Sequence, residues 1–109
     1  MQENNKMLPL GSIVHLKEGT AKMLIMGRAS LLANEGEKPM LFDYASVMYP
    51  IGFNGKEQIY YFNEEHIDQV LFTGFNDSDD ERAQKVLADW KAENAGEYEI
   101  IKIDKPVEN

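Results

Sequence analysis

The sequence predicts a small α+β domain, an SH3-like antiparallel half-barrel of about five strands followed by one amphipathic helix. Short β-rich runs separated by turn residues recur as far as Gly74. A helical apolar period appears only after that point. The chain has 109 residues, 43% of them apolar, which is enough for one core. An open antiparallel sheet with one helix across a face is the alternative architecture.

The first two strands form a predicted hairpin. Ser12–Leu16 and Lys22–Met26 are β-rich and flank a short turn that contains Gly19. Residues 29–40 include a run of charged and turn-forming residues, so we expect a solvated loop there. Further strands are expected at residues 42–49, 58–62 and 70–73.

The helix has the clearest signal in the chain. Ser78 followed by Glu81 forms a capping box, which predicts a helix over residues 79–94. One apolar stripe at helical spacing consists of Ala83, Val86, Leu87 and Trp90. We expect this stripe, Leu87 and Trp90 in particular, to pack on the sheet.

The chain reads as one domain over residues 8–104. Residues 1–7 and 105–109 are polar or follow Pro106, so they are expected to be flexible tails. Tyr98–Ile103 could form a last strand within the domain. Asn63 is expected to cap a single helical turn between the fourth and fifth strands.

Charge and composition restrict the partners. The net charge is −8, and an acidic surface repels phosphate backbones and anionic lipids. We therefore expect no nucleic-acid partner and no membrane insertion. The chain has no cysteine, no signal-like segment and no long apolar run, which suits a cytoplasmic protein.

No catalytic or metal-binding set can be assembled from the sequence. His15 and His66 lack a metal-binding spacing, and each is expected to be structural. The acidic run that begins at Asp77 lacks the glycine and glutamate that a calcium loop needs, because Arg82 and Ala88 occupy those positions. We expect no catalytic residues, no cofactor and no metal, and hence no enzyme.

The aromatic residues suggest a recognition surface instead. Tyr, Trp and Phe are favoured anchors of protein interfaces. The turn after the third strand carries two aromatic residues and one aliphatic residue, and an acidic turn follows the fourth strand. The predicted partner-binding residues are Tyr49, Ile51, Phe53, Tyr61, Glu64 and Glu65. The alternative is that Tyr49, Ile51 and Phe53 close one end of the core.

Several segments in order resemble a known family. They are residues 8–14, 19–28, 43–44, 49–52 and 62–75, the last reading Phe62-Asn63-Glu64-Glu65-His66-Ile67-Asp68-Gln69-Val70-Leu71-Phe72-Thr73-Gly74-Phe75. Over about residues 8–82 the chain is similar to the small proteins grouped as domain of unknown function 4176. Members occur in Gram-positive bacteria, often near type VII secretion genes and their LXG-type toxins.

The resemblance implies a role as a cytoplasmic accessory protein. The expected function is that of a chaperone or targeting factor that binds a secreted toxin or a component of the secretion system. An immunity protein that neutralises a toxin is the second hypothesis, and an enzyme of unrecognised type is the third. The family carries no catalytic residues that could be transferred to this chain.

Overall fold

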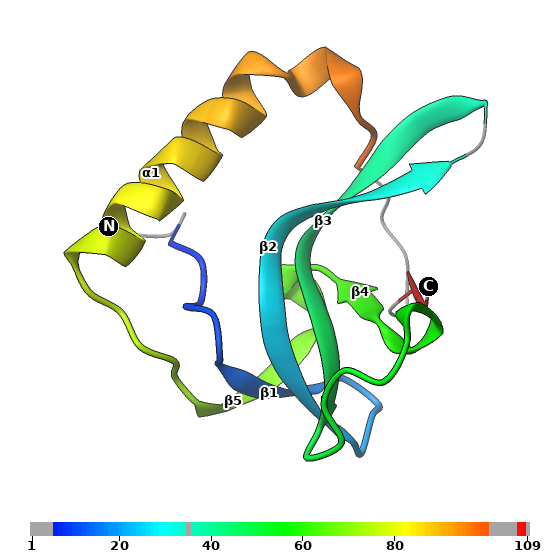
Figure 1. Cartoon of the computed structure of the whole chain (residues 1–109), viewed down its shortest axis with the longest axis vertical. Helices are drawn as coiled ribbons and strands as arrows, with labels where there is room; N and C mark the ends of the chain where they lie inside the picture. Colours follow the sequence, from blue (N-terminus) through cyan, green and yellow to red (C-terminus); the bar gives the residue numbers. More distant parts are fainter. Residues whose placement is uncertain (1–5, 35, 101–106, 109) are drawn as a thin grey trace.

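The protein is an open, curved sheet with one α-helix beside it. A computed structural model describes residues 6–34, 36–100 and 107–108. Within them, six strands pair antiparallel in the order β5-β1-β2-β3-β4-β6 (Figure 1). Because β5 and β6 lie at the two ends of this order, the barrel is not closed. The predicted α+β class with a small half-barrel is confirmed.

From β1 to β4, neighbouring strands in the sheet are also neighbours in the sequence, whereas β5 returns to pair with β1 and β6 pairs with β4. The strands are β1 Ile13–Leu16, β2 Lys22–Asn34, β3 Glu37–Tyr49, β4 Tyr60–Phe62, β5 Ile67–Phe72 and β6 Val107–Glu108. The helices are α1 Ser78–Glu93 and the short 3₁₀ turns η1 Lys56–Gln58, η2 Glu64–His66 and η3 Ala95–Glu97. The Lys17 amide donates to the His66 carbonyl oxygen at 2.9 Å, which joins the end of β1 to the start of β5.

The long hairpin of β2 and β3 corrects the sequence prediction. Residues 29–40 were expected to be a loop, but Ser30 lies opposite Phe42 and Leu32 opposite Met40 in a regular ladder. Of the charged residues in this segment, Glu37 and Lys38 belong to β3. Apolar residues before and after this charged segment continue both strands, because pairing and packing against the neighbouring strand outweigh the local turn propensity.

Two buried clusters form the core. Tyr61 and Phe62 are successive residues of β4 and therefore point to opposite faces of the sheet, so each joins a different cluster. The larger cluster consists of Val14, Leu16, Met23, Ile25, Tyr44 and Phe62. The smaller one consists of Phe42, Ala45 and Tyr61. The aromatic pairs Tyr44–Phe62 and Phe42–Tyr61 each have ring centroids 5.6 Å apart.

The helix begins one residue earlier than predicted. Asp77, not Ser78, is the N-cap, because its Oδ1 accepts the Asp80 amide at 3.0 Å. No residue of α1 is buried. The prediction that Leu87 and Trp90 pack on the sheet is wrong: within the described residues, neither is among the side chains packed against a core cluster. Trp90 instead stacks on Tyr98, beyond the helix, with ring centroids 5.6 Å apart, and Val86 of the same stripe is exposed.

The end of the chain contributes less regular structure. Of the strand predicted at Tyr98–Ile103, residues 101–103 lie outside the described residues, and Glu99 forms an isolated parallel bridge with Met40. Within the segment assigned to the C-terminal tail, Val107–Glu108 forms β6 and pairs with Tyr60 and Tyr61. At the other end, residues 1–5 lie outside the described residues.

Candidate functional site

The turn after β3 presents three large apolar side chains to solvent. Tyr49, Ile51 and Phe53 are exposed, Phe53 by 62%, and together they form what we call the turn patch. The Tyr49–Pro50 peptide bond is cis, and Gly52 adopts a φ of 80° that favours glycine. The Gly52 amide donates to the Met48 carbonyl oxygen at 2.8 Å, which fixes the turn to the end of β3.

Tyr61 does not belong to this surface. It was predicted to contact a partner, but it lies opposite Ala45 in the sheet and is only 9% exposed. Its ring packs against Phe42 in the smaller core cluster. The prediction misplaced it because it assumed that one face of β4 is open to solvent, whereas residues on both faces of that strand are covered.

The acidic turn is held by a network of hydrogen bonds. Asn63 caps η2 and its amide donates to Nδ1 of His66 at 2.9 Å, so the buried His66 has a structural role. The Glu64 amide donates to Asp43 Oδ2 at 2.8 Å, and Glu64 Oε1 accepts from the Tyr44 hydroxyl at 2.7 Å. The side chain of Glu64 is therefore anchored to the middle of β3.

Tyr44 connects this turn to the start of the chain. Its hydroxyl also accepts the Leu8 amide at 2.9 Å. Burial, and then the nearby Glu64 carboxylate, raises the pKa of the Tyr44 hydroxyl far above its ordinary value. The hydroxyl therefore stays protonated and can donate to Glu64. Since Tyr49 lies at the far end of β3, Glu64 and the turn patch are separated along that strand.

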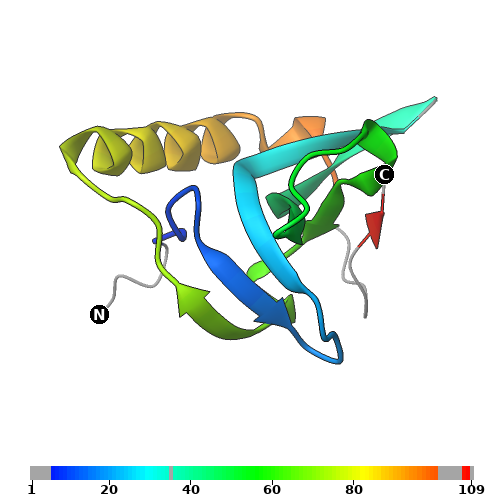
Figure 2. The same ribbon diagram turned by 60° about the horizontal axis from the view of Figure 1, so that its bottom comes forward.

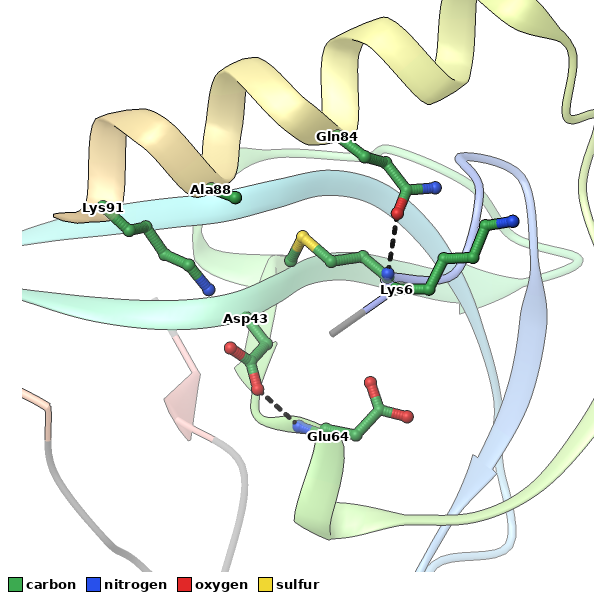
Figure 3. A pocket seen from close by; sticks show the side chains of 7 residues that line it. Lys6, Asp43, Glu64, Gln84, Ala88 and Lys91 are labelled. Carbon is green, nitrogen blue, oxygen red and sulfur yellow. Dashed lines mark hydrogen bonds between the residues drawn. The ribbon is translucent and has the colours of Figure 1, made fainter. Parts of the chain in front are cut away.

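A groove lies between α1, the N-terminal segment and the sheet (Figure 3). It contains a hollow of about 370 Å³ that is lined by Lys6, Met7, Asp43, Glu64, Gln84, Ala88 and Lys91. A second hollow of about 430 Å³ shares three of these residues, so the two adjoin. The side chain of Lys91 extends from the helix toward the sheet in Figure 3.

The helix faces this groove with a polar stripe. Gln84, Ala88 and Lys91 recur at helical spacing, and the Met7 amide donates to Gln84 Oε1 at 2.8 Å. The groove was not predicted from the sequence, because the apolar stripe was expected to be the face of the helix that lies toward the sheet. The lining carries two lysines and two carboxylates, so the groove has no strong preference for a ligand of either charge.

One ion pair ties the helix to the sheet. Arg28 Nη2 lies 2.7 Å from Asp80 Oδ1, and both side chains are largely buried. Burial alone would raise the pKa of Asp80, but hydrogen bonds from Arg28, Gln84 and Asn76 outweigh it, and the pKa is lowered. The pair therefore remains ionised at neutral pH. Arg28 Nη1 also donates to the Leu8 carbonyl oxygen, at 3.4 Å.

The part of the chain that the structure describes has no group of three His, Asp or Glu side chains placed to hold a metal ion. Within the same residues, no helix is long and apolar enough to cross a membrane.

Comparisons with known proteins identify the family and nothing closer. No curated protein matches the chain, and no solved structure does so either. One family model matches residues 7–83, which include every strand from β1 to β5 and the first turn of α1. The chain therefore belongs to the family described as domain of unknown function DUF4176.

Proposed function

We propose that the protein is an accessory factor that works by binding another protein. The turn patch is the observation that carries the proposal. Tyr49, Ile51 and Phe53 are exposed within one short turn and do not close one end of the core. Aromatic and large aliphatic side chains gathered at a surface are the usual anchors of protein interfaces.

The backbone of the turn favours this role. The ring of Pro50 restricts φ, and Gly52 is hydrogen-bonded back to Met48. A turn held in this way loses little conformational entropy when a partner binds, so more of the contact energy contributes to affinity. Lys22 Nζ lies 6.0 Å from the centre of the Tyr49 ring, which helps to orient that ring.

The finer proposal is a cytoplasmic chaperone or targeting factor for a toxin secreted by a type VII system. It is supported by the resemblance to DUF4176 proteins, which are associated with type VII secretion loci and LXG toxins. The client would be the toxin itself or a component of the secretion system.

An immunity protein is the second candidate, and the charge of the chain favours it. A net charge of −8 suits the basic active domain of a nuclease-type toxin, since complementary charge speeds association and selects the partner. An immunity protein would bind and block that active domain. A chaperone would aid export and leave the toxin active.

The proposal predicts a direct complex with a protein encoded beside this one. After co-expression and purification, Phe53→Ala should weaken the complex by more than about 1 kcal/mol, or about fivefold, in a titration calorimeter. Leu31→Ala, which truncates an exposed side chain on the β2–β3 hairpin, is the matched control and should bind like wild type.

If no neighbouring gene product binds, the proposed function is wrong. If a complex forms but Phe53→Ala binds normally, the function stands and the turn patch is not its surface. Expression of the toxin in a host cell then separates the two candidates, because only an immunity protein protects the cell.

A further inference from the structure

The sheet has a free edge at β5. This strand pairs with β1 on one side, and within the described residues no strand pairs with its other side. In Figure 2, β5 runs along β1 at the rim of the sheet, and the chain then rises to the start of α1. A free edge with apolar side chains is a common site of association, and soluble proteins usually protect it.

This edge carries exposed apolar residues where charged ones would be expected. Phe72 is 59% exposed and Phe75 is 79% exposed. The Leu10 segment runs beside them, because a Cβ atom at Gly74 would overlap the Leu10 carbonyl oxygen. The edge patch, as we call it, consists of Leu10, Val70, Leu71, Phe72 and Phe75, all of which are exposed.

Two bulges explain the exposure. Phe72 lies opposite Ile13 and Val70 opposite Val14, so Leu71 is an extra residue; a second register shift makes Asp68 extra as well. The bulges break the alternation that would turn every second side chain inward. The bulges also make the spacing of the outward-facing N–H and C=O groups of β5 irregular, so an added strand could not form hydrogen bonds along the whole edge. A partner must therefore dock mainly through side chains.

Acidic residues flank the patch on both sides. The stretch from residue 64 to residue 81 holds seven Asp or Glu and no Lys or Arg. Along the chain, the exposed acids before the patch are Glu64, Glu65 and Asp68, and those after it are Asp77, Asp79 and Glu81. An apolar centre with acidic surroundings complements a partner with an apolar stripe and basic flanks.

A second copy of the chain fits this surface less well. Antiparallel association of two β5 edges would place Asp68, near the start of one strand, against the apolar end of the other. Each copy also carries a net charge of −8. Repulsion between two copies of the same net charge would oppose the contact.

We propose that the edge patch is a docking surface for a basic, amphipathic segment of another protein. The strands β1 and β2 lie between β5 and the strand that leads to the turn patch. The edge patch is therefore a second surface, and it can bind whether or not the turn patch does.

The test uses a synthetic amphipathic peptide of leucine and lysine, with a leucine–glutamate peptide for comparison, titrated into the full chain by fluorescence anisotropy. Wild type should bind the basic peptide and not the acidic one. The double variant Phe72→Ser/Phe75→Ser should bind it at least about fivefold more weakly. Val86→Ser, on α1, is the matched control, because Val86 is exposed to a similar degree and belongs to neither patch, and it should bind like wild type.

Equal binding by all three proteins would overturn the proposal, because net charge alone would then explain the attraction. Analytical ultracentrifugation tests the other occupant. If wild type self-associates and the double variant does not, the patch binds a second copy of the chain and the proposal is wrong. The double variant should have an unchanged melting temperature, since both rings are exposed. A loss of binding by this folded variant is then due to the removed side chains and not to unfolding. Because the probe is a peptide, the result does not depend on the client of the proposed function.

Discussion

The centre of the sheet and its periphery use apolar residues in opposite ways. In the centre, Val14, Ile25 and Phe62 are almost fully buried. At the periphery, β5 exposes three apolar residues in succession, and α1 buries none of its residues. Four of the six residues of β5 are apolar, so the exposure of this strand reflects its position in the fold and not its composition.

This difference separates stability from recognition. The central strands supply the buried core clusters, while the contacts of the helix with the rest of the chain include the Arg28–Asp80 ion pair, the Met7–Gln84 hydrogen bond and the Trp90–Tyr98 stack. Apolar residues that stability does not require remain available to partners. Substitutions in the two regions should therefore have different consequences.

The largest expected effect comes from comparing the same type of substitution, phenylalanine to alanine, in the centre and at the periphery of the sheet. Phe62→Ala removes a ring that is completely buried against Tyr44 and should cost about 3–5 kcal/mol of unfolding free energy. Phe72→Ala removes an exposed ring and should change the same quantity by less than about 0.5 kcal/mol. Urea denaturation followed by circular dichroism measures both. Similar losses from the two variants would show that β5 is part of the core.

The next effect tests the attachment of the helix. Asp80→Asn leaves the Arg28 guanidinium charged in a largely buried place. It should cost about 3 kcal/mol, near the lower end for a broken buried pair because the Leu8 carbonyl oxygen also accepts from Arg28. Asp79→Asn, which removes a partner of an exposed ion pair with Arg82, is the control and should cost less than about 1 kcal/mol.

The same pair predicts a dependence on pH. The pKa of Asp80 is lower in the folded protein than its ordinary value of 3.8, so the stabilisation is complete above pH 3.8 and is lost as the pH falls through the lowered value. The difference in unfolding free energy between wild type and Asp80→Asn should therefore be constant near neutral pH and should shrink below pH 3.8. A difference that persists unchanged in stronger acid would contradict the role of this carboxylate.

The smallest effect concerns the apolar stripe of the helix. Trp90 is half-buried and stacks on Tyr98, so Trp90→Ala should cost about 1–2 kcal/mol, below the value for a buried ring. Thermal unfolding monitored by circular dichroism measures the shift. A loss of 3 kcal/mol or more would mean that the helix packs more tightly than its exposed residues indicate.

The fold could be predicted well where local signals and burial agree. The hairpin of β1 and β2, the end of β3 at Pro50 and the helix after Asp77 all follow from turn residues, alternation or capping. The prediction failed at residues 29–40, because the charged tip of a long hairpin has the same composition as a loop. Only the apolar residues around it, such as Leu32 and Phe42, signalled that both strands continue.

The candidate surfaces were predictable only in part. Residue type identified Phe53 as a possible anchor, but it could not separate Phe53 from Tyr61, since exposure depends on which strands are covered. The edge patch was missed because the position of β5 in the sheet follows from its pairing with β1, a contact between segments far apart in the chain. The residues of β5 alone read as an ordinary buried strand.

The hydrogen bond between Met7 and Gln84 also bears on how the protein is made. It joins residues 77 positions apart in the sequence, whereas the contact of Leu8 with Tyr44 spans 36. On the ribosome, the Tyr44 contact can form as soon as β3 has emerged, but the Met7 amide lacks its Gln84 partner until the first half of α1 has emerged. The groove beneath the helix is therefore completed late in synthesis, after the core cluster on which Met7 also packs.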